Sequence, residues 1–243
     1  NATLTLKALP SMSNRPTRSP ELIPDYLLDT YWWAYLTPEA IRLFDRPWLI
    51  NLILWGNYRR LTRELIKEVR PHLKSTVVQI GCVYGELTNQ VSGALKQGSQ
   101  YTVVDVAPIQ LAHLQSKLAG RPELQYLQAD ATDLTLPSSQ SDLTVLFFLV
   151  HELPSAEKTL ALNEAWRITK PKGKLVVIDY HRPSPMNPIG WLMKFVLNKL
   201  EPFALEIWDT EMSRFLTSKQ KPRRVEKKTF FGGLYQKVTF IKN

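Results

Sequence analysis

The sequence predicts an α/β fold in which a mostly parallel β-sheet carries helices on both faces. After Pro71, short apolar runs of β-type alternate with helical windows, which is the pattern of parallel strands joined by crossover helices. The run 145–150 is apolar throughout, as expected of a strand that is buried on both sides. Near the C-terminus, two β-type runs flank Gly232 and Gly233, which predicts an antiparallel hairpin.

The expected elements follow one another without an internal repeat. Strands are expected over residues 76–80, 101–105, 124–128, 143–148 and 174–180, with helices over 86–96, 108–118 and 156–169 between them. A further amphipathic helix is expected over 187–200, and the hairpin strands over 225–231 and 234–241. The sheet is therefore predicted to be parallel except at its last hairpin.

The N-terminal part of the chain divides into a leader and an aromatic-rich segment. Residues 1–24 are predicted to be a flexible leader, because several prolines prevent regular structure there. Their basic, acid-poor start suits either the end of a mitochondrial targeting segment or a leader without an address. Pro38 and Pro47 are placed to open helices within 25–70, and the window 47–61 is apolar on most sides, so its helix is either buried or on a membrane. Residues 71–243 are predicted to form the ligand-binding domain that contains the sheet.

Composition limits the class of protein. The 243 residues are 44% hydrophobic, which is enough for the core of one domain. The single cysteine, Cys82, excludes an intramolecular disulfide and a cysteine-based zinc cluster. A net charge of +9 predicts either an anionic partner (nucleic acid, acidic lipid or a phosphorylated ligand) or a merely solvated basic surface.

A glycine-containing turn follows the first expected strand. The pattern for binding S-adenosylmethionine (SAM) is an acid followed by G-x-G-x-G at this point, and Gly81 and Gly85 match it. Gln79 replaces the acid and Val83 replaces the central glycine. We expect Gln79, Gly81, Cys82, Val83 and Gly85 to contact SAM, although an ordinary strand–helix turn would have the same glycines.

Acidic residues close the next two expected strands. Asp105 ends the second strand, about twenty residues further on, where a carboxylate accepts hydrogen bonds from ribose hydroxyls. Asp130 follows the third strand and is expected beside the adenine. Val106 and Ala131, their neighbours, complete the expected SAM site; the alternative role for both acids is helix capping.

Four polar residues follow the fourth and fifth expected strands. His151 and Glu152 come after the fourth, and Asp179 and His181 come at the end of the fifth. Since the carboxyl ends of parallel strands share one edge, these side chains are expected to converge, either for proton transfer or to hold a divalent metal. Tyr84 is expected nearby as a hydrogen-bond donor. The alternative is a pair of unrelated loop histidines with capping carboxylates.

Eight segments give the chain a specific resemblance to a known family. The sequence over roughly residues 26–241 resembles the rhodoquinone biosynthesis enzymes, which are methyltransferase-like proteins. The segments are YWWAYL (31–36), FDRPWL (44–49), NLILWGNY (51–58), CVYG (82–85), HELP (151–154), DYHRP (179–183), LEPFAL (200–205) and FFGGLYQKV (230–238). The resemblance implies a Rossmann-like class I SAM-methyltransferase fold with an N-terminal helical lid.

The resemblance also implies an activity. Enzymes of this family replace a methoxy group of ubiquinone by an amino group, with SAM as the amino donor and divalent manganese (Mn²⁺) as a cofactor. His151, Glu152 and Tyr84 are then the expected catalytic residues, and His151, Glu152, Asp179 and His181 the expected metal ligands. A neutral Gln79 fits this chemistry, because it would not stabilise the ammonium of SAM and would leave the amine more nucleophilic.

Other functions remain open at the level of sequence. A conventional SAM-dependent methyltransferase acting on a quinone or a quinone precursor needs only the fold, although Gln79 and Val83 depart from its pattern. An RNA-binding protein is not expected, because the basic residues are not interleaved with stacking aromatics.

The expected substrate places the protein at a membrane. Ubiquinone carries an isoprenoid tail, so we expect a peripheral protein on the bacterial or mitochondrial inner membrane. Residues 47–55 and 187–197 combine tryptophan with other apolar residues, and the run 219–228 is basic. The aromatic helices are equally suited to covering the active site.

Overall fold

The fold is a seven-stranded sheet with helices on both faces. The computed structural model describes residues 23–69 and 73–243. The strand order is β3-β2-β1-β4-β5-β7-β6. Strands β1 to β5 pair in parallel, and β7 pairs antiparallel with both β5 and β6. Their bounds are β1 Thr76–Ile80, β2 Gln100–Asp105, β3 Leu124–Gln128, β4 Ser141–Phe147, β5 Thr169–Tyr180, β6 Arg224–Phe230 and β7 Tyr235–Ile241.

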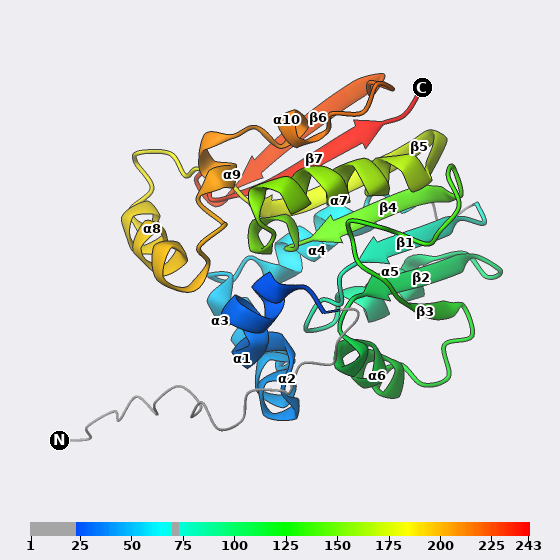
Figure 1. Cartoon of the computed structure of the whole chain (residues 1–243), viewed down its shortest axis with the longest axis horizontal. Coiled ribbons are helices and arrows are strands. Elements are labelled where there is room, and N and C mark those ends of the chain that lie inside the picture. The colour runs from blue at the N-terminus through cyan, green and yellow to red at the C-terminus, as the bar shows by residue number, and fades with distance from the viewer. Residues whose placement is uncertain (1–22, 70–72) are drawn as a thin grey trace.

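Crossover helices cover both faces of this sheet. Figure 1 shows α7 (Ser155–Ile168) in front of the central strands and α4 (Tyr58–Ile66) and α5 (Leu87–Ala94) behind them. The strands between the helices are buried on both sides, and Val77, Val145 and Val176 are at most 1% exposed. The helices of this part are α5 Leu87–Ala94, α6 Pro108–Lys117, α7 Ser155–Ile168, α8 Ile189–Leu200, α9 Glu206–Asp209 and α10 Met212–Phe215. The predicted parallel sheet with a C-terminal antiparallel hairpin is confirmed.

The N-terminal helices lie at the carboxyl end of the parallel strands (Figure 1). A π-helical turn over Leu27–Tyr31 leads into α1 (Trp32–Tyr35) and α2 (Pro38–Phe44). Thr37 caps α2, since its hydroxyl accepts the Ala40 N–H at 3.2 Å, and Pro38 is its first residue. A second apolar cluster joins Leu27, Tyr31 and Leu36 to Ala107, directly after β2. These helices therefore cover the edge of the sheet where the predicted site lies.

The prediction of one helix over 47–61 is wrong. The structure has two helices, α3 (Pro47–Ile53) and α4 (Tyr58–Ile66). Between them, Trp55 and Gly56 have φ angles of 51° and 76°, which end an α-helix. The Trp55 indole N–H donates to the Met193 sulfur at 3.1 Å, so packing against α8 favours this turn.

Two predictions concern the edges of the described ranges. Almost all of the expected leader, 1–24, lies outside the described residues, as does the expected boundary at 70/71. Within 23–69 and 73–243, none of the helices combines the length and the apolar character needed to cross a membrane.

Candidate active site

The predicted glycine turn forms at the carboxyl end of β1. Gly81 and Gly85 have φ angles of 90° and 86°, a region that favours glycine. A Cβ atom on Gly85 would lie 2.8 Å from the Tyr58 hydroxyl, so this glycine also permits the turn to pack against α4. The same hydroxyl accepts the Glu86 N–H at 2.8 Å. The turn is therefore held in place by the first residue of α4.

Asp105 lies where a ribose-binding carboxylate is expected. Its Oδ2 accepts the Cys82 N–H at 2.6 Å and its Oδ1 accepts the Ala107 N–H at 2.8 Å, which ties the end of β2 to the glycine turn. Burial raises the pKa of Asp105, against these backbone hydrogen bonds. Each carboxylate oxygen keeps a second lone pair, so the side chain retains acceptors for a vicinal diol.

The remaining expected SAM contacts line the same edge. Asp130 follows β3, and its Oδ1 accepts the N–H and the hydroxyl of Thr132, both at 2.7 Å. Ala131 is half-buried against the main core, and Val106 packs against the apolar cluster of the N-terminal helices. The expected contacts therefore gather at the ends of β1, β2 and β3, beneath those helices.

Gln79 lies below the turn and not on its surface. The residue is fully buried, its amide donates to the Gly81 carbonyl at 2.9 Å, and its Oε1 accepts the Tyr101 and Thr88 hydroxyls. In the structure this side chain supports the backbone of the turn. Gln79 can therefore affect SAM binding in two ways. It lacks the negative charge of the acid in the SAM pattern, and it shapes the backbone of the turn.

We expect Asp105→Ala to weaken SAM binding by about 1–3 kcal/mol, because ribose hydroxyls and two backbone N–H groups would lose their acceptor. Calorimetric titration with SAM measures the change. Asp142→Ala is the matched control, since Asp142 pairs with Lys170 at 3.0 Å at the amino end of β4. Equal affinity in Asp105→Ala and the control would refute the assignment.

Tyr84 connects the glycine turn to the N-terminal helices. Its hydroxyl donates to the Ala34 carbonyl at 2.6 Å and accepts from the Gln110 amide at 2.7 Å. The Tyr35 ring stacks on it with a centroid distance of 5.7 Å. Both hydroxyl contacts are to the protein, so in the structure Tyr84 holds the glycine turn against the N-terminal helices. We call these helices, which span residues 27–44, the lid.

Asp45 makes a second connection of this kind. It follows α2, and its Oδ1 accepts the Gly85 N–H at 2.8 Å. Lys117 of α6 contacts both Asp45 oxygens at 3.0 and 2.9 Å and also donates to the Gly85 carbonyl at 2.7 Å. His113 Nε2 lies 2.9 Å from Asp45 Oδ2. The carboxylate thus holds the lid, the glycine turn and α6 together.

A buried imidazole–carboxylate cluster occupies the ends of β4 and β5. His151 Nδ1 lies 2.9 Å from Asp179 Oδ1, and the Asp179 side chain is fully buried. The other ring nitrogen, Nε2, lies 3.9 Å from Glu152 Oε1 and 4.0 Å from Glu201 Oε2. Tyr35 of α1 donates a hydrogen bond to Glu152. We call His151, Glu152, Asp179 and Glu201 the buried cluster.

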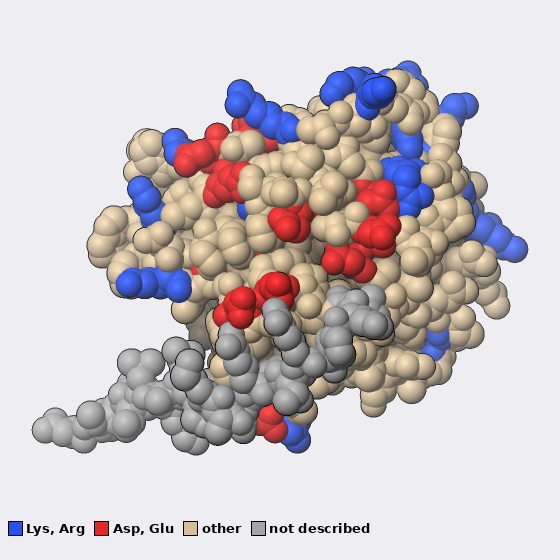
Figure 2. Space-filling model, in the orientation of Figure 1, with Lys and Arg blue, Asp and Glu red and all other residues tan. Residues whose placement is uncertain are grey.

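The pKa values of His151, Glu152 and Glu201 in the buried cluster are all raised. Burial lowers the pKa of His151, but the negative charges of Asp179, Glu201 and Glu152 outweigh it and raise that pKa to about 9. Burial, reinforced by the charge of Glu201, raises the pKa of Glu152 against the opposing effect of His151. Three carboxylates face one imidazole, so the cluster can take up and release protons and favours a cationic ligand. Acidic side chains also gather over the middle of the face in Figure 2, with Lys and Arg mostly around its rim.

Glu201, Tyr31 and Tyr35 lie at the site but were not expected there from the sequence. Glu201 ends α8, and burial raises the pKa of its carboxyl. Burial and the neighbouring charge of Glu201 raise the pKa of Tyr31. The only signal was indirect: all three residues stand in segments that carry the family resemblance.

The prediction that His181 joins the metal ligands is wrong. Its N–H donates to the Leu234 carbonyl at 2.8 Å, and its Nδ1 lies 2.7 Å from the Gly233 carbonyl, so the residue is held against the hairpin turn between β6 and β7. Asp179 accepts the N–H groups of His151 and Tyr180 at 3.2 and 2.7 Å. Across the part of the chain that the structure describes, no group of three or more His, Cys, Asp or Glu residues is arranged to hold a metal ion. The predicted ligand set does not fit manganese, and we derive no step from it.

Known proteins show the same type of domain. Residues 78–177 match the family model of the methyltransferase domain. The demethylmenaquinone methyltransferase of Desulfitobacterium hafniense is 27% identical over 72% of this chain and 70% of its own length. The ubiquinone/menaquinone biosynthesis C-methyltransferase of Azotobacter vinelandii is 26% identical, and the match covers 56% of this chain and 54% of that protein. The chain thus spans between about half and 70% of the length of these two relatives.

Solved structures agree in fold. A SAM-dependent methyltransferase from Aquifex aeolicus superposes with a TM-score of 0.53 at 18% identity, covering 85% of this chain and 99% of that one. The mitomycin 7-O-methyltransferase MmcR gives a TM-score of 0.66 at 19% identity, with coverage of 88% and 61%. With the glycine turn and Asp105 in their expected places, the chain has the Rossmann-like fold of the class I SAM-dependent methyltransferases and is related to the quinone methyltransferases.

Proposed function

We propose that this protein transfers the amino group of SAM to the ring of ubiquinone, displacing a methoxy group, and so makes rhodoquinone. The observation that carries the proposal is the convergence of the resemblance segments. Tyr35, Asp45, Glu152, Asp179 and Glu201 come from five such segments, and all lie around the glycine turn and the buried cluster. The relatives named for quinone methylation support a quinone as the acceptor.

The cluster suits the proton transfers of this reaction. The ammonium of SAM must lose a proton before its nitrogen can attack a ring carbon. His151 or Glu152 accepts that proton, and the C–N bond forms while charge moves onto the quinone oxygen. The C–O bond to the methoxy group then breaks, and the methoxy oxygen takes the proton that the nitrogen gives up and leaves as methanol. To free the amino group, a base then removes a proton from the β-carbon of the SAM side chain, the bond between the nitrogen and the α-carbon breaks, and the nitrogen takes a proton. The products are the aminoquinone and a SAM remnant with a double bond between its α- and β-carbons.

The position of Gln79 supports amino chemistry. A neutral, fully buried amide stands where the SAM pattern has an acid, so that position does not stabilise the ammonium. The amine is then deprotonated more readily. Val83 adds bulk in the same turn, where the pattern has glycine.

We expect Gln79→Glu to lower the rate near neutral pH by roughly tenfold, the effect of about one pKa unit on the amine. The rate should recover at higher pH, because the ammonium then loses its proton despite the added charge. Rates between neutral and alkaline pH measure this, with the exposed Gln90→Glu on α5 as the matched control. A loss of rate that is equal at every pH would contradict the explanation.

Methyl transfer to a quinone or a quinone precursor is the second candidate, and the comparisons favour it. The matching family model and the relatives described above are methyltransferases. In that reaction the buried cluster would take a proton from the acceptor ring, and SAM would leave as S-adenosylhomocysteine.

One assay separates the two reactions. The pure protein is incubated with SAM that carries heavy nitrogen in its amino group and with either a short-chain ubiquinone or a short-chain precursor that lacks the ring methyl group. Each reaction is run with and without manganese, which the family resemblance implies. The proposal expects a quinone that has exchanged a methoxy for a heavy amino group. A quinone or precursor heavier by one methylene, with S-adenosylhomocysteine, would establish methyl transfer instead.

A further inference from the structure

Helix α3 exposes Pro47, Trp48, Leu52 and Ile53, while Leu49 and Ile50 are half-buried. Its sequence is PWLINLI, and none of its residues is buried. Trp48 is 60% and Leu52 is 65% exposed, and their spacing of four residues places them on one face. A short helix with no buried residue gains little from the protein core, so this face calls for a partner outside the described chain.

Helix α8 is apolar on two faces. Met193 and Leu197 point inward and are at most 3% exposed. Trp191 and Phe195 lie on another face and are 80% and 58% exposed. An ordinary surface helix would carry polar residues there. The outer face of α8 is therefore a second unpartnered apolar surface.

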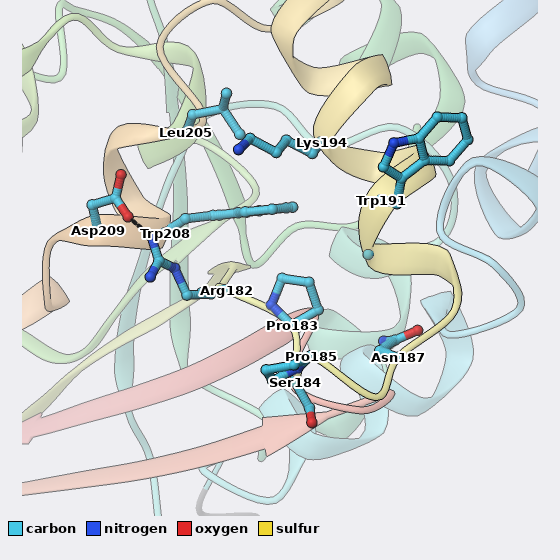
Figure 3. Close-up of a pocket in the computed structure, with 11 residues that line it drawn as sticks. Arg182, Pro183, Ser184, Pro185, Asn187, Trp191, Lys194, Leu205, Trp208 and Asp209 are labelled. Atoms are coloured by element: carbon cyan, nitrogen blue, oxygen red, sulfur yellow. Dashed lines mark hydrogen bonds and ion pairs between the residues drawn. The ribbon is translucent and has the colours of Figure 1, made fainter.

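The two helices adjoin each other. The hydrogen bond from Trp55 to Met193 joins the turn after α3 to α8, and the two lie together in Figure 1. A hollow of about 420 Å³ lies between α3 and Phe231, and another of about 390 Å³ lies between α8 and α9. In the latter, Lys194 reaches over the Trp208 ring while Trp191 points away (Figure 3). We call Trp48, Leu52, Trp191, Leu192 and Phe195 the α3–α8 surface.

The two chain segments that carry this surface are basic, although Asp209 of α9 lines the hollow beside α8 and pairs there with Arg182. Residues 46–63 and 180–200, which include α3 and α8, contain arginine and lysine but no aspartate or glutamate. Lys194 and Lys199 lie exposed on α8 itself. Tryptophan and lysine beside exposed aliphatic residues are the composition of helices that lie in the headgroup region of a bilayer.

We propose that the α3–α8 surface docks on an anionic lipid bilayer. Figure 1 shows both helices at the carboxyl end of the sheet, where the buried cluster lies. Aromatic rings run inward from the first hollow: Phe231 stacks on Tyr235 at 6.2 Å, Tyr235 lies 5.8 Å from Tyr180, and Tyr180 lies 4.8 Å from His151. This last step rests on the proposed function: a quinone held in the leaflet would lie close to the buried cluster.

The basic run 219–228 is not part of this surface. Arg224 begins β6 and pairs with Ile241, which in turn pairs with Lys174 near the amino end of β5. The run before Arg224 therefore lies at the opposite end of the sheet from the site. The sequence suggested that the basic run would be drawn to anionic lipid, but its part before Arg224 lies away from the α3–α8 surface.

Vesicle binding tests the proposal without any chemistry. The full chain is mixed with vesicles of phosphatidylcholine alone or with phosphatidylglycerol, free of quinone and SAM, and sedimented. We expect preferential binding to the anionic vesicles and a loss of affinity of at least roughly tenfold in the double variant Trp191→Ser, Phe195→Ser. Leu160→Ser is the matched control, because Leu160 is 52% exposed on α7.

Charge reversals locate the docking face. Lys194→Glu should weaken binding to anionic vesicles by roughly fivefold, as expected for one basic residue near the surface, while Lys219→Glu should not. Equal binding by the double variant and wild type would overturn the proposal, as would a loss seen only in Lys219→Glu. Concentration-dependent self-association that disappears in the double variant, without vesicle binding by wild type, would instead make this face a contact between copies. A failed amino-transfer assay leaves these outcomes unaffected.

Discussion

Replacing Glu152 or His151 by glutamine is expected to lower the transfer rate by on the order of 10²–10⁴, the usual contribution of a positioned acid or base. Both residues are buried at the crevice end of β4, and His151 Nε2 lies 3.9 Å from Glu152 Oε1. His181→Gln is the matched control, because the His181 side chain contacts the hairpin turn and not the buried cluster. Its rate should stay near that of wild type. Full activity in both cluster variants would show that His151 and Glu152 have a structural role and no catalytic one.

The same cluster predicts how the rate depends on pH. The pKa of His151 is raised to about 9, so its ring becomes a free base only as the pH rises through that value. We therefore expect the rate to increase from neutral pH towards pH 9. Asp179→Asn removes the largest of the charges that raise this pKa, so the increase should move to lower pH. A profile that does not move would exclude His151 as the titrating group.

Asp45→Ala is expected to lower the free energy of unfolding by roughly 2–4 kcal/mol, because it leaves a largely buried charge partner and a backbone N–H without their acceptor. The Asp45 and Lys117 side chains are only 14% and 20% exposed. The glycine turn loses the same contact, so SAM affinity should fall as well. Denaturant unfolding and calorimetry measure the two effects.

Glu39→Ala is the matched control for Asp45→Ala. Glu39 lies on α2 and pairs with Arg42 at 3.4 Å, but both side chains are 71% exposed, so the pair contributes little. A loss of stability in Asp45→Ala no larger than in Glu39→Ala would contradict the role of Asp45 as the joint between lid and turn.

The sheet was predictable because its signals are local. The strands β1 to β3 are apolar runs bounded by turn residues, and their predicted bounds agree with the structure to within one residue. The break between α3 and α4 was not predictable, because the left-handed turn at Trp55 accompanies a contact with Met193, 138 residues away.

The site was predictable only where strand ends define it. Asp105 and the pair His151 and Asp179 follow from the shared edge of parallel strands. His181 stands two residues after Asp179, which would put both on one face of a continuing strand. The strand ends at Tyr180, however, and backbone contacts to Gly233 and Leu234 turn His181 away. The contact between Tyr35 and Glu152 depends on where the lid lies, which no local pattern specifies.

The attachment of the lid to the glycine turn has a kinetic consequence. Tyr84 and Asp45 bind the turn to the N-terminal helices, and those helices also pack on Val106 and Ala107. We therefore expect SAM and its product to exchange through a movement of these helices. We expect opening of the lid to limit turnover at high pH, where proton transfer in the buried cluster is fastest. Turnover would then fall with solvent viscosity, and a ligand that holds the lid closed would act as a slow, tight inhibitor.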